Sequence, residues 1–131
     1  MSILVIDDDV LITNLVARIL KPEGQEVLVV NKPEDAMAVA EAAGDVDLII
    51  SDAVMPGISG PELVEQLVQK YPRVKVLFMT GLGRFPIQVS FGGTCEFIQK
   101  PFRAAELVKT VKAMMDVQAS NDLSCSAVAG T

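Results

Sequence analysis

Short apolar runs alternate with longer amphipathic stretches along most of the chain. The runs are too short for helices, are rich in β-branched residues and are bounded by turn residues, which is typical of buried strands. We therefore predict strands over 3–6, 26–30, 48–52, 74–79 and 95–99.

Between these strands, apolar residues recur at the three- and four-residue spacing of a helix packed on one face. The expected helices cover about 10–20, 33–43, 60–70 and 103–115. Asp9 is the expected N-cap of the first helix. Strands and helices that alternate through short connections imply right-handed crossovers and a parallel sheet covered on both faces. The pattern thus predicts an α/β fold.

Two segments depart from this alternation. Residues 81–93 contain several glycines and a proline, so we expect at best a short helical turn over Pro86 to Phe91. Residues 117–131 are rich in small and polar residues and lack periodicity, so we expect a disordered tail. The folded domain is accordingly predicted over 1–116.

Composition narrows the possible functions. A chain of 131 residues, half of them apolar, suits one domain with a sizeable core, and a formal charge of −6 argues against a nucleic-acid partner. No apolar run reaches membrane-spanning length and no leader is recognisable, so we expect no membrane role. Cys95 and Cys125 are interpreted as free thiols of a cytoplasmic protein. The absence of histidine means that any phosphohistidine must come from a partner.

Reactive side chains stand where four of the predicted strands end. Asp7 and Asp8 follow the first strand, Asp52 ends the third, Thr80 follows the fourth and Lys100 follows the fifth. In open parallel sheets these ends share the edge at which ligands bind. Clustered carboxylates favour a hard divalent cation such as Mg²⁺, and with Lys100 offsetting charge a phosphoryl group could be held on Asp52.

These residues occur in motifs that resemble the receiver domains of response regulators in two-component signalling. The motifs are the pair Asp7-Asp8, the run Asp-Ala-Val-Met-Pro-Gly-Ile-Ser-Gly from Asp52, Phe-Met-Thr-Gly around Thr80, and Lys-Pro-Phe from Lys100. The resemblance spans about residues 2–116. It implies a flavodoxin-like five-stranded parallel sheet of order 2-1-3-4-5 with helices on both faces, here with an irregular or shortened fourth helix.

The resemblance also implies a metal site and a phosphoacceptor. Asp52 would accept a phosphoryl group. Mg²⁺ would be bound by Asp8 directly, by Asp7 mainly through a water, by the Val54 backbone carbonyl and by Asp52.

Further roles follow from the same resemblance. Thr80 would donate its hydroxyl to the phosphoryl group, and Lys100 would pair with another of its oxygens. Thr80 and the aromatic Phe97 match the switch positions of the family. Val54 and Leu82 resemble the positions that flank the path of hydrolytic water in the family, and because both are apolar we expect slow self-dephosphorylation.

The leading hypothesis is a phosphoacceptor switch, not an enzyme acting on external substrates. It would be phosphorylated by a histidine kinase or a histidine phosphotransfer protein and would act on an unknown protein target through a surface around residues 80–115. A dimer that forms on phosphorylation is compatible with the resemblance. The chain could be a stand-alone regulator or the receiver of a hybrid kinase.

Two alternatives remain open. A haloacid dehalogenase-like phosphatase also uses an aspartyl nucleophile, Mg²⁺, a hydroxyl and a lysine, and Asp7 and Asp9 have its Asp-x-Asp spacing. Turnover of a phosphate monoester would favour it. A binding module of the same fold that is never phosphorylated would instead fail to be labelled on Asp52.

Overall fold

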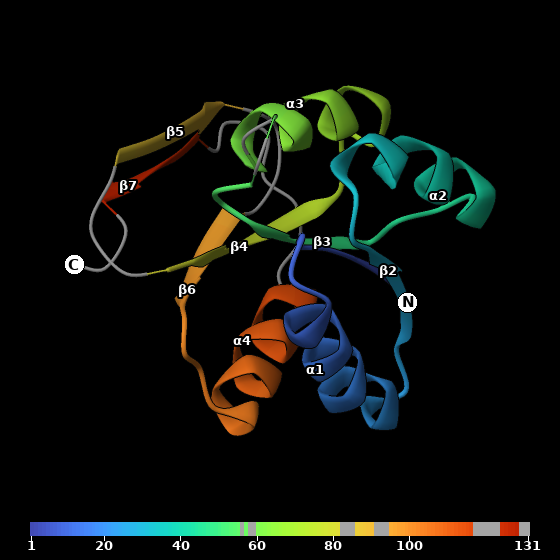
Figure 1. The fold of residues 1–131 in the computed structure, drawn as a ribbon, viewed down its shortest axis with the longest axis vertical. Helices are drawn as coiled ribbons and strands as arrows, with labels where there is room; N and C mark the ends of the chain where they lie inside the picture. The colour runs from blue at the N-terminus through green and yellow to red at the C-terminus, as the bar shows by residue number, and fades with distance from the viewer. Residues whose placement is uncertain (56, 58–59, 82–85, 91–94, 117–123, 129–131) are drawn as a thin grey trace.

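A five-stranded parallel sheet forms the centre of the protein in the computed structural model (Figure 1). The structure describes residues 1–55, 57, 60–81, 86–90, 95–116 and 124–128. The strand order is β2-β1-β3-β4-β6, which confirms the predicted order 2-1-3-4-5 for the five strands of this sheet. The strands are β1 (Ser2–Ile6), β2 (Glu26–Val30), β3 (Leu48–Asp52), β4 (Lys75–Thr80) and β6 (Cys95–Gln99).

Helices cover both faces of the sheet, as the alternating pattern predicted. The helices α1 (Val10–Leu20) and α4 (Ala104–Asp116) lie on one face, and α2 (Ala36–Ala43) and α3 (Gly60–Lys70) on the other (Figure 1). Two short 3-10 turns, η1 (Lys21–Glu23) and η2 (Pro33–Asp35), flank α1 and α2. Asp9 caps α1 as expected, because its side chain accepts a hydrogen bond from the Leu11 N–H.

The central strands β1, β3 and β4 are apolar on both faces because each face of the sheet has its own helical layer. Successive side chains of a strand point to opposite faces. Ile3 and Val5 of β1 therefore pack with α1 and α4, whereas Leu4 and Ile6 pack with α2 and α3. Near-continuous apolar strands are characteristic of parallel sheets buried on both sides. The polar ends of the strands are left as the place where chemistry can occur.

The expectation of a short helical turn between β4 and β6 is wrong. The described residues of this segment hold a strand, β5 (Pro86–Ser90). It pairs antiparallel with β7 (Ser124–Val128), the part of the predicted disordered tail that the structure describes. The partner strand comes from far along the chain, so local periodicity could not indicate this pairing.

Cys95, at the start of β6, corrects another expectation. The residue is disulfide-bonded and is not a free thiol.

No helix in the described part of the chain combines the length and the apolar character needed to span a bilayer.

Gly60 allows α3 to begin directly against the end of β3. Its N–H donates to the Ala53 carbonyl at 3.1 Å. A Cβ at this position would overlap the Asp52 carbonyl oxygen and lie 2.9 Å from the Ala53 Cα. A side chain here would therefore displace the end of the strand that carries Asp52.

Candidate functional site

The carboxyl ends of β1, β3, β4 and β6 meet at one edge of the sheet. Their registers place Ile6 beside Ser51 and Asp52 beside Met79. Thr80, expected just after β4, is its last residue. The structure brings Asp7, Asp8, Asp52 and Lys100 together at this edge, although they come from widely separated parts of the chain.

Lys100 joins the two buried carboxylates. Its Nζ lies 2.9 Å from Asp7 Oδ2 and 3.3 Å from Asp52 Oδ1. The side chains are 21%, 1% and 11% exposed for Lys100, Asp7 and Asp52, respectively. One ammonium group thus faces two carboxylates, with a third, that of Asp8, close by. The described residues leave an excess of negative charge at this edge.

Burial determines the protonation behaviour of these groups. It raises the pKa of Asp52 above its ordinary value of 3.8, and the Lys100 charge and the Val54 N–H offset this only in part. Burial likewise raises the pKa of Asp7, against the Asp9 N–H and Lys100. For Lys100 burial acts to lower the pKa, but the Asp7 hydrogen bond and the two carboxylate charges outweigh it, so this pKa is raised. Lys100 therefore offsets the burial of the two carboxylates only in part.

The acidic cluster fits a hard divalent cation. Asp7, Asp8 and Asp52 each offer a carboxylate oxygen, and these oxygens lie within 4.8 Å of one another. Both oxygens of Asp7 are already engaged, one by the Asp9 N–H at 2.9 Å and the other by Lys100. Asp8 is exposed, and the described residues give its carboxylate no hydrogen bond or ion pair. Asp8 is thus the more available direct ligand, and Asp7 is better suited to act through a bound water.

The two expected switch residues lie on β4 and β6: Thr80 is the last residue of β4, and Phe97 is in the middle of β6. Thr80 is buried, and its hydroxyl donates to the Ile98 carbonyl across a long 3.4 Å. The half-buried Phe97 ring stacks on Phe78, its register partner on β4. The ring centroids are 5.6 Å apart and the planes differ by 26°. The Thr80 hydroxyl is therefore held by a weak contact and not by one to Asp52.

Of the two residues expected to tune hydrolysis, the structure describes only Val54. Val54 is 63% exposed, and its N–H lies 3.4 Å from Asp52 Oδ1. Leu82 lies outside the described residues.

Asn31 and Thr13 contact this site and were not singled out from the sequence. Asn31, directly after β2, donates from its side-chain nitrogen to the Asp7 carbonyl at 3.0 Å and to Thr13 Oγ1 at 2.8 Å. The position of Asn31 in the sequence could have indicated its place near the site, because Asn31 follows a strand that ends at the same edge of the sheet.

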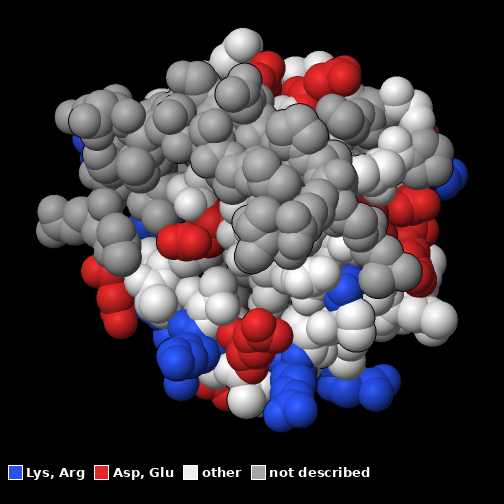
Figure 2. Space-filling model, turned by 90° about the vertical axis from the view of Figure 1, so that its left-hand side faces the viewer, with Lys and Arg blue, Asp and Glu red and all other residues white. Residues whose placement is uncertain are grey.

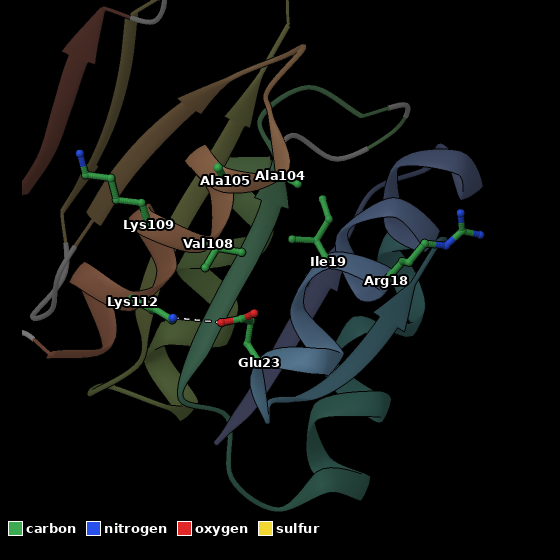
Figure 3. A pocket seen from close by; sticks show the side chains of 8 residues that line it. All are labelled: Arg18, Ile19, Glu23, Ala104, Ala105, Val108, Lys109 and Lys112. Carbon is green, nitrogen blue, oxygen red and sulfur yellow. Dashed lines mark ion pairs between the residues drawn. The ribbon is translucent and has the colours of Figure 1, made fainter.

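A cavity of about 710 Å³ lies elsewhere, between α1 and α4. Ile19 and Val108 point into this space from the two helices, and Lys112 pairs with Glu23 at 3.0 Å (Figure 3). Lys and Arg side chains gather at the lower end of the molecule, where α1 and α4 lie (Figures 1 and 2). The cavity has a single acidic residue in its lining and lacks the convergent carboxylates of the sheet edge.

Comparison with known proteins gives one consistent family. The family model of the response regulator receiver domain matches residues 3–112. The sensor kinase CckA of Brucella abortus is 30% identical over 124 residues, covering 89% of this chain and 13% of the kinase. The transcriptional regulatory protein FixJ of Azorhizobium caulinodans is 35% identical over 115 residues, covering 85% of this chain and 53% of FixJ. The chain thus spans about half, or far less, of these curated relatives.

A solved structure agrees with the sequence comparisons. The receiver domain of the hybrid histidine kinase CckA is 30% identical, with a TM-score of 0.74, and the match covers 88% of this chain and all of that one.

Replacing Asp52 with Asn is expected to stabilise the protein near pH 7 in the absence of divalent cations. Because its pKa is raised in the folded state, Asp52 keeps its proton there at pH values at which the unfolded chain has lost it. The contribution of the protonated carboxyl to stability is therefore lost as the pH rises from 3.8 through the raised pKa of the folded state. Urea unfolding should show a gain in free energy of unfolding above the roughly 0.5 kcal/mol typical of surface substitutions.

This gain should shrink as the pH is lowered to about 4, because protonated Asp52 resembles Asn. Asp9→Asn is a suitable control, since Asn caps a helix as well as Asp does. An equal gain at both pH values would contradict the prediction.

Proposed function

The chain belongs to the response regulator receiver family, the phosphoacceptor switches of two-component signalling, and we propose that Asp52 is the residue that carries its phosphoryl group. The observation that carries this proposal is the buried Asp52 carboxylate beside Lys100 and within one cluster with Asp7 and Asp8. A carboxylate becomes a useful nucleophile towards phosphorus only where nearby charge offsets its own charge and that of the incoming group.

The transfer takes its phosphoryl group from a phosphohistidine of a partner. The bond between phosphorus and the partner's imidazole nitrogen breaks, and a bond to an Asp52 carboxylate oxygen forms. This chain has no histidine, so the donor is another protein or domain, of the histidine kinase or histidine phosphotransfer type. Lys100, 3.3 Å from the Asp52 carboxylate, would pair with a phosphoryl oxygen, and the Thr80 hydroxyl would donate to another.

Mg²⁺ is the cation that this donor set fits best. Asp8 and Asp52 would bind it through carboxylate oxygens, Val54 through its backbone carbonyl and Asp7 mainly through a water. When bound, the ion would offset the negative charge of the carboxylates and of the phosphoryl group. A site with so few protein donors suits Mg²⁺, which usually keeps several of its waters.

Exposed apolar side chains near the site support a protein as donor. Leu11 and Leu15 lie on α1, which begins just after the acidic turn, and are 78% and 41% exposed; Val54 is exposed two residues beyond Asp52. Large exposed apolar residues are typical of protein contact surfaces. Transfer from a kinase that uses ATP would place the protein in the cytoplasm, and a downstream protein target would read the switch, with or without phosphorylation-dependent dimerisation.

The switch is assigned to residues 1–116, and no chemical role is assigned to 117–131. The domain assists its own phosphorylation and dephosphorylation without turning over an external substrate. The phosphatase alternative is not favoured, because the exposed Asp9 caps α1 and lies outside the carboxylate cluster of Asp7, Asp8 and Asp52.

Phosphorylation by acetyl phosphate tests the proposed acceptor. The wild-type chain should become labelled only when Mg²⁺ is present, and Asp52→Asn should reduce labelling by at least about 100-fold, to background, because the amide is not a nucleophile. Asp9→Asn should be labelled like the wild type. Intact mass and mapping of the acyl phosphate are the measurements, and a label on another carboxylate in the wild-type chain would overturn the proposal.

The response to phosphorylation would pass through Thr80 and Phe97. A phosphoryl group brings up to about two negative charges and several acceptor oxygens, and these can draw the Thr80 hydroxyl from its weak contact with the Ile98 carbonyl. The space that the hydroxyl leaves would allow the Phe97 ring to move from its stack on Phe78. The resulting change of surface extends over the described parts of 80–115.

Thr80→Val removes the hydroxyl with little change of shape, so it should uncouple labelling from the movement of Phe97. We expect the aromatic NMR signals of Phe97 to shift on phosphorylation of the wild type and to shift by less than about half as much in labelled Thr80→Val. Thr80→Ser, which keeps the hydroxyl, should behave like the wild type. A full shift in Thr80→Val would argue against this route.

Val54 and Leu82 would give the phosphorylated state a long lifetime, because neither apolar side chain can orient a water for attack. Replacing Val54 with Asn is expected to shorten the lifetime several-fold, since an exposed amide beside Asp52 can hold a water. The decay of the label after removal of acetyl phosphate is the measurement, with Val54→Leu as the apolar control. If the lifetime is the same in both variants, Val54 has no such role.

A further inference from the structure

We infer that Asn31, supported by Thr13, is a positioning residue that sets the affinity of the acidic turn for its cation. This inference rests on the proposed function and adds to it residues outside the cluster of ligands. It is carried by hydrogen bonds that join the end of β2, the turn after β1 and the first turn of α1.

Asn31 fixes the backbone from which the acidic side chains project. Its side-chain nitrogen donates to the Asp7 carbonyl at 3.0 Å. This carbonyl belongs to the peptide that joins Asp7 to Asp8, so its orientation governs the direction in which the Asp8 side chain leaves the turn. The Asp7 N–H is held in addition by the Val30 carbonyl at 3.1 Å.

Thr13 holds Asn31 in place from the side of α1. The Thr13 hydroxyl accepts from the Asn31 side chain at 2.8 Å and donates to the Val10 carbonyl at 3.1 Å. Thr13 is completely buried, so this hydroxyl could not easily exchange its partners for water. Asn31 therefore has a fixed direction.

Asp8 is the residue that needs this support. It is exposed, and the described residues give its carboxylate no hydrogen bond or ion pair that would hold it towards Asp52. By contrast, Asp7 is fixed by the Asp9 N–H and by Lys100. The placement of Asp8 beside the other two carboxylates thus depends on the backbone of the turn, which Asn31 holds. Partners of this kind outside the ligands commonly change metal affinity by about 10- to 100-fold.

The test compares Mg²⁺ binding in Asn31→Ala and in the wild type. Calorimetry with Mg²⁺ alone should give a dissociation constant about 10-fold higher for Asn31→Ala. The Mg²⁺ concentration that gives half-maximal labelling of Asp52 by acetyl phosphate should rise by the same factor. Saturating Mg²⁺ should restore the maximal labelling rate to within about twofold, because Asn31 does not contact the reacting atoms.

Three variants control for a purely structural effect. Asn14→Ala removes an exposed Asn from the same region of α1 and should leave Mg²⁺ binding unchanged. Thr13→Val keeps the shape but removes the hydroxyl, so it should weaken Mg²⁺ binding in the same direction, whereas Thr13→Ser should retain it. Urea unfolding shows which variants are folded under the conditions used for binding.

The outcomes separate the two proposals. Suppose that the wild type binds Mg²⁺ and is labelled on Asp52, but that the Mg²⁺ dissociation constants of folded Asn31→Ala and Thr13→Val lie within about twofold of the wild-type value. Asn31 and Thr13 then only join β2 to α1, and the inference is wrong. If Asn31→Ala does not fold, Thr13→Val decides by the same criterion. If the wild type neither binds Mg²⁺ nor is labelled on Asp52, the proposed function itself fails, and this inference fails with it.

Discussion

The contact of one ammonium group with two buried carboxylates is the constraint on which the rest of this structure depends. Lys100, directly after β6, contacts Asp7 and Asp52 at the carboxyl edge of the sheet. Removing charged groups from water is costly, and such a group is tolerated only when partners compensate its charge. Here compensation is incomplete, as the raised pKa values of both carboxyls indicate. The incomplete compensation is what suits this edge to a cation and to a transferable phosphoryl group.

The sheet makes this arrangement possible because its strands are parallel and apolar. The central strands β1, β3 and β4 are covered by helices on both faces, so their polar side chains are confined to the strand ends. The shared register then places these ends side by side, and the close approach of α3 at Gly60 keeps the end of β3 fixed. A rigid scaffold therefore holds reactive groups that are distant in the sequence.

The site has two sides with different supports. On the β1 side, the acidic turn is held by the 3.0 Å hydrogen bond from Asn31 to the Asp7 carbonyl and by the Asp9 cap, which suits the precise placement of ligands. On the β4 and β6 side, the Thr80 hydroxyl makes only a long contact, and Phe97 is half-buried. A new charge on Asp52 would therefore move Thr80 and Phe97 more easily than the acidic turn after β1. This difference would direct the response towards β4 and β6.

The sequence by itself determined the α/β fold, because strand and helix periodicities and the Pro and Gly residues that separate them are local properties. The grouping of Asp7, Asp8, Asp52, Thr80 and Lys100 followed from their places at the ends of the predicted strands. The order of the sheet followed from a family resemblance carried by short motifs. Only the tertiary structure decided what depends on contacts between distant segments. It gave the pairing of β5 with β7, the disulfide of Cys95 and the tether from Asn31 to the Asp7 carbonyl. Local sequence patterns do not indicate these contacts, because a strand pairing, a disulfide or a hydrogen bond between distant segments depends on where the fold brings the two segments together.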